Sequence, residues 1–414
     1  MKMSIKRKTP KPDRPLYRSL QALSLGLVLS LGFTEPGARA EPIKPVPIMV
    51  EVNEAKVALG RRLFHDPRLS KNNTVSCATC HDLSAGGDDG QVVSIGIEGR
   101  PGLVNAPTVF NSGYNFKQFW DGRAHTLEEQ VDGPLQSRIE MESIWPDVVT
   151  KLFQDEDYPR LFQEAYPNDA QIISRENIKE AIAEFQRSLI TPNSRFDQWL
   201  RGNVGALNEQ EKEGYALFKR YGCVSCHQGA NVGGNMFQVF GVINDYFRKR
   251  GNITDADLGR FNVTGNEADK HAFKVPSLRM AAHTAPYLHD GSAETLRDAV
   301  DAMFEFQLGR EAPDEDKEAI VAFIKTLAGE YQFDPGQGPI SAEFQESLNG
   351  NLGQRAAPTG IQDISTTGTS QERPPADRAE TVSQNGSTRP LRTGRSVRTR
   401  SKVGRATGPV RSGR

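Results

Sequence analysis

Cysteine and histidine occur in this chain in a pattern that can bind a metal-containing cofactor. The chain has four cysteines, and all of them belong to two copies of the motif Cys-x-x-Cys-His. The copies consist of Cys77, Cys80 and His81, and of Cys223, Cys226 and His227. The two thiols of such a motif can add to the vinyl groups of one haem, and the adjacent histidine can ligate its iron. The motifs therefore predict two covalently bound haem c groups.

Two other kinds of site also use paired cysteines. A thioredoxin-like redox pair is expected as a single motif within a β-α-β unit. A structural zinc site needs a clear second pair of ligands, which is missing beside either motif. Both interpretations fit the chain less well than covalent haem, and no cysteine is left over for a disulfide.

The segments around each motif repeat, which indicates two similar helical units that each position one haem. Residues 60–64 precede the first motif and residues 214–218 the second, and glycine pairs at 86–87 and 233–234 follow them. An amphipathic helix then closes each half. The apolar residues at helical spacing are Ile178, Ile182, Phe185 and Leu189 after a cap at Ser174, and Ile320, Phe323, Ile324 and Leu327 after Asp314. Strand signals are sparse, so we predict a mainly α fold with two cytochrome c-like helical haem domains in tandem.

The length of the chain and one turn signal suggest where these domains divide. A chain of 414 residues has room for two domains and extensions. The sequence Pro-Asn-Ser at residues 192–194 follows the first closing helix and favours a boundary near residues 192–205. We therefore predict an N-terminal haem domain over residues 41–195 and a C-terminal haem domain over residues 196–335.

Residues 1–40 have the features of a cleavable secretory signal peptide. Residues 20–33 form an apolar run and residues 38–40, Ala-Arg-Ala, offer a cleavage site. Basic residues precede the run at Lys2, Lys6, Arg7, Lys8 and Lys11. The run is shorter than the roughly 20 residues that span a bilayer, although an uncleaved anchor is the alternative. We expect a mature protein that begins near Glu41 and is located in the periplasm, because bacteria attach c-type haem after export.

The charge of the chain is distributed unevenly. Residues 336–414 contain scarcely any large apolar residue and predict a disordered tail. Its last part, residues 389–414, carries nine basic residues and no acidic one; it either binds an anionic surface or is simply solvated. Residues 1–40 and 336–414 each carry a net charge of +6, and subtracting both from the total of -1 leaves -13 on residues 41–335. Such an acidic body favours a small basic electron-donor protein as partner and repels nucleic acid.

Further segments occur in a fixed order between residues 50 and 330. They are residues 63–70 (LFHDPRLS), 105–108 (NAPT), 119–124 (FWDGRA), 284–287 (TAPY) and 307–309 (QLG). Together with the two motifs, these segments resemble the bacterial di-haem cytochrome c peroxidase family, which includes the MauG-type maturation enzymes. The resemblance does not cover the tail.

The resemblance implies a division of labour between the two haems. The haem of residues 41–195 would be peroxidatic, and that of residues 196–335 would take electrons from a donor and have the higher potential. Trp120 matches the family tryptophan that lies between the haems, where an ordinary buried aromatic residue is the alternative. Asn105, Thr284 and Pro286 match the ligands of an interfacial calcium ion, for which oxygen ligands are suited.

The same resemblance assigns roles to three further side chains. Glu140 matches the acid/base group above the first haem, and Gln130 would help to orient peroxide or water. Peroxide cleavage needs a group that takes a proton from one oxygen and returns it to the other, which a carboxylate with a raised pKa can do. Met303 matches the distal ligand of the second haem, and a thioether ligand raises the potential of iron. Met280 and Met236 are the fallback candidates for that ligand.

One position departs from the family pattern. Many members carry a histidine in the loop after the first motif, where it caps the peroxidatic iron until the other haem is reduced. In this chain Ile97 occupies that place, and isoleucine cannot ligate iron. We therefore expect a first haem that is open without reductive activation, as in the MauG-type branch, although that branch has a tyrosine at the place of Met303. Another histidine is the alternative ligand, and the remaining ones are His65, His125, His271, His283 and His289.

These expectations lead to a cytochrome-c peroxidase as the first functional hypothesis. It would reduce hydrogen peroxide with electrons from a small cytochrome c or cupredoxin, and it is compatible with a homodimer. MauG-type oxidation of residues on a partner protein is the second hypothesis. A non-catalytic electron carrier or redox sensor is the third, and Glu140 and Gln130 argue against it because a carrier needs no proton-transfer group beside an open iron.

Overall fold

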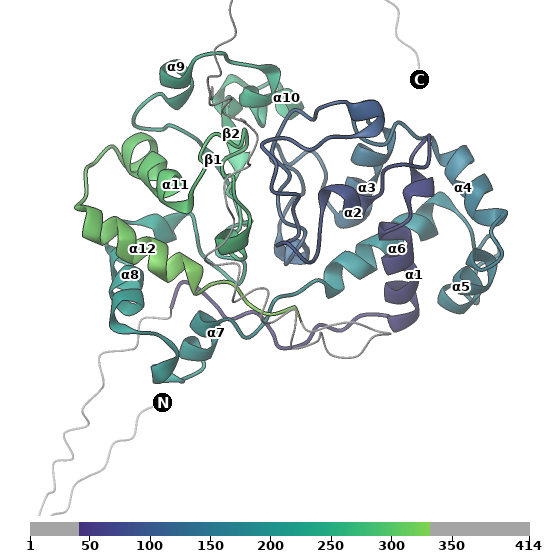
Figure 1. Cartoon of the computed structure of the whole chain (residues 1–414), viewed down its shortest axis with the longest axis horizontal. Helices are drawn as coiled ribbons and strands as arrows, with labels where there is room; N and C mark the ends of the chain where they lie inside the picture. Colours follow the sequence, from purple (N-terminus) through teal and green to yellow (C-terminus); the bar gives the residue numbers. More distant parts are fainter. Residues whose placement is uncertain (1–40, 332–414) are drawn as a thin grey trace, which may run out of the picture. The chain divides into compact units, whose positions relative to one another are not determined.

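The computed structural model describes residues 41–331, and its architecture is shown in Figure 1. The expected signal peptide at residues 1–40 and the expected tail at residues 336–414 lie outside the described residues. The helical content agrees with the predicted mainly α fold. No helix among residues 41–331 combines the length and the apolar character that crossing a membrane requires.

The first half of the chain consists of helices and connecting loops. Its helices are α1 (Glu54–Phe64), α2 (Cys77–Cys80), α3 (Leu127–Gln136), α4 (Trp145–Phe153), α5 (Tyr158–Ala165) and α6 (Arg175–Ser188). Short 3-10 turns lie between them at η1 (Pro67–Leu69), η2 (Ile97–Gly99) and η3 (Ser112–Tyr114). The predicted cap of α6 is confirmed, because the Ser174 side chain accepts a hydrogen bond from the backbone N–H of Asn177.

The second half repeats this plan and adds one small sheet. Its helices are α7 (Arg195–Leu200), α8 (Glu209–Arg220), α9 (Tyr246–Arg250), α10 (Phe261–Thr264), α11 (Leu296–Ala302) and α12 (Asp314–Lys325). The antiparallel strands β1 (Phe237–Val239) and β2 (Ala272–Lys274) pair with Phe237 opposite Lys274. The short turns are η4 (Val204–Ala206), η5 (Cys223–Ser225), η6 (Asp255–Leu258), η7 (Glu267–Asp269) and η8 (Ala281–His283), and α11 continues into the π-helical turn η9 (Met303–Leu308).

Each half is built on one tight helix crossing, and glycine allows both. Helix α1 packs on α6 at Gly60, where an added Cβ would overlap the carbonyl oxygen of Ala181. Helix α8 packs on α12 at Gly214, where an added Cβ would overlap the carbonyl oxygen of Ala319 in the same way. The two halves therefore share a crossing between the helix that precedes the Cys-x-x-Cys-His motif and the last helix of the half.

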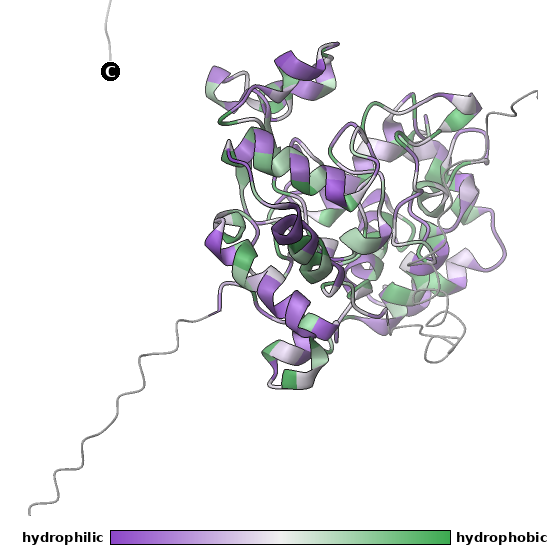
Figure 2. Ribbon diagram, turned by 60° about the vertical axis from the view of Figure 1, so that its left-hand side comes forward, coloured by the Kyte–Doolittle hydropathy of each residue, from purple (hydrophilic) through white to green (hydrophobic). Residues whose placement is uncertain are grey.

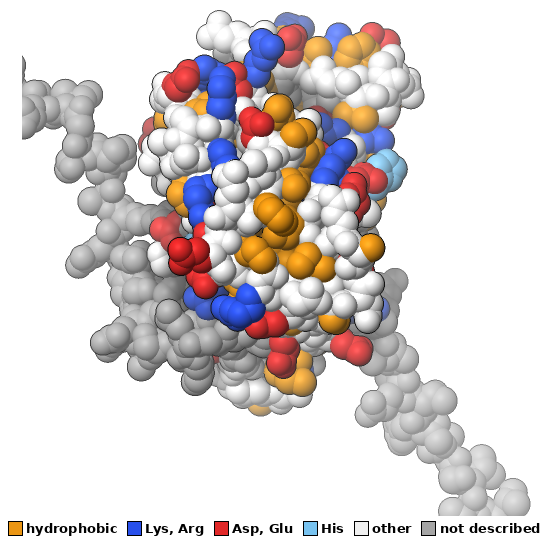
Figure 3. Space-filling model, turned by 90° about the vertical axis from the view of Figure 1, so that its right-hand side faces the viewer, with side chains coloured by type: hydrophobic (Ala, Val, Ile, Leu, Met, Phe, Trp, Pro, Cys, Tyr) orange, Lys and Arg blue, Asp and Glu red, His pale blue; other side chains and the backbone are white. Residues whose placement is uncertain are grey.

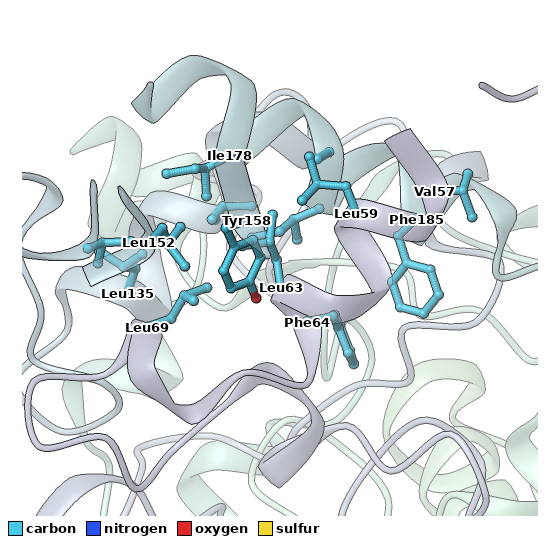
Figure 4. Packing of buried hydrophobic residues seen from close by; sticks show 14 of the residues in the cluster. Val57, Leu59, Leu63, Phe64, Leu69, Leu135, Leu152, Tyr158, Ile178 and Phe185 are labelled. Carbon is cyan, nitrogen blue, oxygen red and sulfur yellow. The ribbon is translucent and has the colours of Figure 1, made fainter. Parts of the chain in front are cut away.

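Two apolar cores accompany these crossings. The first contains Leu63, Phe64 and Phe185 from α1 and α6, together with residues of α3 to α5, and part of it is shown in Figure 4. The second contains residues of α7, α8, α11 and α12. Figure 2 shows that hydrophobic and hydrophilic residues alternate along the helices, as expected where one face of each helix is buried.

The ends of the described segment connect the two halves. Ile43, before α1, belongs to the second core, and its neighbour Lys44 accepts a hydrogen bond from the buried Arg279 at 3.1 Å. Tyr331, after α12, packs on the first core with its ring 5.3 Å from that of Phe110. The domain boundary near residue 195 stays a prediction, but the core of each half includes residues from beyond it.

The surface carries charges of both signs. On the face in Figure 3, basic and acidic side chains surround a group of hydrophobic side chains. This face therefore has no continuous region of one charge, although residues 41–335 carry a net charge of -13 in total.

Candidate functional site

A cavity of about 1240 Å³ runs between the two halves and contains the predicted site residues. Both Cys-x-x-Cys-His motifs line it, and so do Trp120, Gln130, Glu140, Met303, Asn105, Thr284 and Pro286. The predicted residues, which are spread over more than 220 positions of the chain, therefore come together in space. Its walls combine both motifs with many apolar side chains, as a pair of covalently bound haems requires.

Among the four cysteines of the motifs, the first one of each motif has the properties of a thiol rather than of a thiolate. All four are free, and they lie at the cavity wall. Burial raises the pKa of Cys77 to about 12 and that of Cys223 to about 11. A catalytic redox pair needs a thiol with a lowered pKa. The geometry thus favours attachment of haem over thioredoxin-like chemistry.

The histidines of the two motifs are oriented by the same device. His81 bonds through Nδ1 to the carbonyl oxygen of Gly87 at 3.1 Å, and His227 bonds through Nδ1 to that of Val232 at 3.2 Å. Burial lowers the pKa of both imidazoles, that of His227 to about 4. A neutral imidazole that donates through Nδ1 presents Nε2 as the ligand atom. Both histidines are therefore prepared to ligate an iron in the cavity.

Glu140 lies in a segment that a neighbouring loop holds in place. The backbone N–H of Ile97 donates to the carbonyl oxygen of Glu140 at 2.8 Å, and the Arg100 guanidinium donates to the carbonyl oxygen of Arg138. Gly96 packs so closely that an added Cβ would lie 2.7 Å from the Cα of Glu140. The loop that follows the first motif is thus a support for the segment of Glu140.

The carboxyl group of Glu140 has the environment expected of an acid/base group. Burial raises its pKa above the ordinary value of 4.5, while a hydrogen bond from Ser137 and the charge of Arg123 oppose the shift. Gln130 lies on α3, which begins at the N-cap Thr126 and carries Glu140 in the loop after its end. One helix and its C-terminal loop therefore bring both predicted polar side chains to the cavity, although their roles stay predictions.

Trp120 lies at the contact between the two halves. Its indole Nε1 donates to the carbonyl oxygen of Asn105 at 2.9 Å, and its own carbonyl oxygen accepts from the N–H of Lys274 at 2.8 Å. The ring meets His289 edge-on with the centroids 6.4 Å apart. From the second half, Arg260 donates to the carbonyl oxygen of Gly122 at 2.9 Å. The first half thus holds the indole through Asn105, and the second half holds the backbone of the same segment through Lys274 and Arg260.

Met303 is the methionine that the structure brings to the cavity from the second half. It is the first residue of the π-helical turn η9 that follows α11, and such turns are frequent at functional sites. Neither fallback candidate lines the cavity, since Met280 is packed in the first core and Met236 lies before β1. The position of Met303 therefore supports the predicted ligand, which stays a prediction.

The predicted calcium ligands come from both halves. Asn105, Thr284 and Pro286 all line the cavity, and the amide nitrogen of Asn105 donates to the carbonyl oxygen of Gln91 at 2.8 Å. The residues offer oxygen atoms, which fit calcium, and the ion stays a prediction.

Ile97 and the remaining histidines give a consistent picture of the first site. The Ile97 side chain is 0% exposed and belongs to the first core. Among the five other histidines, all of which lie within the described residues, His289 lines the cavity, but its Nε2 bonds to Asp257 at 2.7 Å. His65 and His271 bond to backbone carbonyl oxygens. His65, His125, His271 and His283 do not line the cavity, so the open first iron stays a prediction that their positions support.

The structure also shows residues that the sequence patterns did not single out. Gly96 packs closely against the backbone of Glu140, and the Arg260 side chain bonds to the carbonyl oxygen of Gly122. Both contacts join segments that are distant in the sequence. Lys274 is a buried lysine beside Trp120. Asp257, His289 and Asp290 bring potential metal-ligand atoms within 4.8 Å of one another, but Arg250 already pairs with both carboxylates. This last cluster is therefore explained as an ion-pair network.

Comparisons with known proteins identify the family of the chain. Residues 54–205 match the model of the family described as di-haem cytochrome c peroxidase. The chain is 50% identical over 299 residues to the cytochrome c peroxidase Ccp of Escherichia coli (strain K12), covering 72% of this chain and 63% of that protein. It thus spans less than two thirds of the length of that relative.

Two further similarities cover nearly the whole of the other protein. The chain is 46% identical to the cytochrome c551 peroxidase of Nitrosomonas europaea, over 77% of this chain and 92% of that protein. A crystal structure of a MauG-like protein associated with microbial copper homeostasis is 32% identical, with a TM-score of 0.63 over 72% of this chain and 96% of that one. The chain therefore belongs to the di-haem cytochrome c peroxidase family of haem c-containing oxidoreductases.

Proposed function

We propose that this protein is a cytochrome-c peroxidase that reduces hydrogen peroxide to water with electrons from a small cytochrome c or cupredoxin. The observation that carries the proposal is the position of Glu140, a carboxyl group with a raised pKa in the cavity of the first motif. When bound, the haem of the first half supplies the iron at which peroxide is cleaved, and that of the second half the iron that accepts electrons from the donor.

Glu140 would hold and move the proton that peroxide cleavage requires. Its carboxylate takes the proton from one peroxide oxygen and, as a carboxylic acid, returns it to the other, so that this oxygen leaves as water. The raised pKa helps the second step, because a weaker acid holds the proton until it is needed. The amide of Gln130, on α3 in the same cavity, would orient the peroxide.

Trp120 would serve the passage of electrons between the two halves. Its aromatic ring occupies the boundary at which the halves exchange backbone hydrogen bonds. Arg260 donates to the carbonyl oxygens of Asp121 and Gly122, which directly follow Trp120, and would thereby hold the ring in one orientation. A fixed aromatic group between two redox centres is suited to this role, whereas a mobile one would change their separation.

Two features would make the two sites different. Met303 supplies a thioether ligand in the second half, which favours the reduced iron. Ile97 leaves the first site without a capping side chain, because its own side chain is buried in the core. We infer that the first site accepts peroxide without prior reduction.

The remaining proposals concern the ion, the compartment and the assembly. Asn105, Thr284 and Pro286 would hold calcium at the boundary of the halves. The family relatives are bacterial, and export by the signal peptide of residues 1–40 would place the protein in the periplasm. A homodimer stays a prediction.

A steady-state assay tests the proposed function. Full-length protein as isolated and protein reduced beforehand by one electron are compared for peroxide turnover with reduced cytochrome c. Equal turnover by both supports a peroxidase with an open first site. Turnover that appears only after reduction contradicts the open site, and a protein inactive in both states with several donors contradicts the peroxidase itself.

MauG-type oxidation of a partner protein remains the second candidate, and Ile97 is the observation that favours it. The same assay separates the two functions. A protein-oxidising enzyme would consume peroxide in the presence of a protein substrate but hardly with reduced cytochrome c alone. Electron paramagnetic resonance of the oxidised protein adds a direct view, because an open ferric haem gives a high-spin signal.

A further inference from the structure

Lys274 is a charged side chain for which the described part of the protein offers no counter-charge. It ends strand β2, and its residue is 7% exposed. No ion pair or hydrogen bond joins its ammonium group to another described side chain, and burial alone lowers its pKa to about 8. A buried ammonium group is strongly unfavourable unless an anion lies beside it.

The surroundings of Lys274 show where such an anion would lie. The residue lines the haem cavity, and its N–H donates to the carbonyl oxygen of Trp120 at 2.8 Å. Strand β1 places Phe237 opposite Lys274, and the next residue of that strand, Gln238, has its Nε2 3.9 Å from the Sγ of Cys226. The two-stranded sheet of β1 and β2 therefore borders both the boundary of the halves and the second attachment site.

The other neighbours of Lys274 do not provide the anion. Phe273 and Val275 flank it in the chain and are both buried. The carboxylates of Asp257 and Asp290 are already paired with Arg250. An anion that enters the cavity with its occupant is the remaining source, and a haem carries propionate carboxylates at its edge.

We propose that the ammonium group of Lys274 binds a propionate of the haem attached at Cys223 and Cys226. The inference depends on haem attachment and not on the peroxidase activity. The contact neutralises a carboxylate near the second iron. Because a nearby negative charge stabilises the ferric state, the lysine raises the potential of the haem that receives electrons, in the same direction as the thioether of Met303.

The second half thereby differs from the first at corresponding places. Asn105 and Lys274 occupy corresponding positions, because each precedes a proline by two residues. Each also donates its backbone N–H across the boundary of the halves at 2.8 Å: Asn105 to the carbonyl oxygen of His289, and Lys274 to that of Trp120. The first position carries a side chain suited to bind a cation, and the second carries a cation of its own. The chain thus places a fixed positive charge on the side of the second haem.

The test compares variants of the full-length holoprotein. In Lys274→Met the charge is removed, in Lys274→Gln the polar end is kept without charge, and in Lys274→Arg the charge is kept. Lys270→Met is the matched control, because it removes an exposed lysine four positions earlier. Haem content is measured first, and both midpoint potentials are then determined by spectroelectrochemical titration.

Two results support the proposal together. The midpoint potential of the second haem falls in Lys274→Met and Lys274→Gln but not in Lys274→Arg or Lys270→Met. The carboxylate bands in the reduced-minus-oxidised infrared difference spectrum shift in the same two variants. Unchanged potentials, a change of the first haem alone, or a lower potential without a carboxylate shift would each overturn the assignment. Peroxide turnover is not needed for any of these readouts.

Discussion

The two halves of the molecule place different side chains at equivalent positions of the same helix. Helix α3 in the first half and helix α11 in the second both begin after a threonine N-cap, Thr126 and Thr295. At the same distance from its cap, the first half has Pro134 and the second has Met303. One half therefore has no ligating atom where the other presents a thioether sulfur.

The difference continues along the same helices. Gln130 of α3 corresponds to Ala299 of α11, so the polar side chain occurs in the first half alone. The loop after α3 leads to Glu140, whereas α11 continues directly into the π-helical turn η9. One scaffold would thus support an open site with a proton-transfer group and a site closed by a ligand, and the proposed distinction depends on few residues.

The scaffold itself is nearly the same in both halves. His81 and His227 are oriented by carbonyl oxygens at 3.1 and 3.2 Å. Asp132 on α3 pairs with Lys179 of α6, and Asp301 at the equivalent place on α11 pairs with Lys317 of α12. The shared residues would hold the haems and join the helices, and the residues that differ between the halves would decide the chemistry of each site.

The largest expected effect comes from removing one attachment site. Cys77→Ala with Cys80→Ala should leave one haem per chain and abolish peroxide turnover, because the first site then has no covalently held haem. Cys223→Ala with Cys226→Ala should also leave one haem but abolish turnover with the protein donor. A pyridine haemochrome assay counts the haems. A count of one haem in the unaltered protein would contradict the prediction that each half binds a haem.

Loss of the acid/base group should be the next largest effect. Glu140→Gln should lower kcat by about 100- to 10,000-fold, which is the usual contribution of such groups, with both haems retained. Glu129→Gln, a change of an exposed carboxylate on α3, is the control. Wild-type turnover in Glu140→Gln would show that the halves do not differ through this residue.

The pH dependence of the same group can be derived from its environment. Burial raises the pKa of Glu140 above 4.5, so the ionised base is lost at a higher pH than for an exposed carboxyl group. The acidic limb of the kcat/KM profile should therefore lie above pH 4.5. Arg123→Met removes a charge that lowers this pKa and should move the limb to still higher pH. A limb that moves down, or not at all, would contradict the assigned base.

A smaller loss should follow from disturbing the support of Glu140. Gly96→Ala places a Cβ 2.7 Å from the Cα of Glu140 and should displace its segment. Misplacement of a reacting group by about 1 Å can reduce rates on the order of 100-fold. The acidic limb should move as well, which a merely less stable protein would not show. Gly113→Ala, whose Cβ would find its nearest neighbour at 3.7 Å, is the control.

Much of this site was accessible from the sequence, because its chemistry is local. A Cys-x-x-Cys-His motif contains all its attachment atoms within five residues, and Ser174 precedes its helix directly. The predicted helices around Ile182 and Phe323 follow from periodic apolar residues that pack in the observed cores. The roles of Glu140 and Met303 came from resemblance, because a single side chain has no local pattern.

The remainder required coordinates because it depends on contacts between distant segments. The loop of Ile97 supports Glu140 across more than forty residues of sequence. Lys274 looks like an ordinary strand lysine until its burial and its lack of a described partner are seen. The sequence likewise shows no sign that Ile43 belongs to the second core and that Tyr331 packs on the first.

Met303 offers a test in which only the second half should respond. Met303→His should keep a ligand on the second iron but lower its midpoint potential, because imidazole stabilises ferric haem more than a thioether does. The first potential should stay the same. Met280→Leu, a change within the first core, is the control. Two unchanged potentials in Met303→His would exclude this methionine as the ligand and remove the difference between the halves at this position.

The smallest effect concerns the scaffold that the halves share, and here the halves should behave alike. Gly60→Ala and Gly214→Ala each gain helix propensity worth up to about 1 kcal/mol. In both variants, however, the new Cβ overlaps a backbone carbonyl oxygen and lies 2.9 Å from the Cβ of a phenylalanine, Phe185 or Phe323. Neither group can rotate away, and overpacking of this kind costs about 1–3 kcal/mol.

The cost of overpacking should therefore exceed the gain in propensity at both crossings. Chemical denaturation should show a lower free energy of unfolding for both variants, by similar amounts. Gly205→Ala, whose Cβ would find its nearest neighbour at 3.7 Å, should not be destabilised. If Gly60→Ala alone were destabilising, the crossing of α8 and α12 would tolerate a wider separation than that of α1 and α6. The halves would then differ in their scaffold as well as in the residues above their haems.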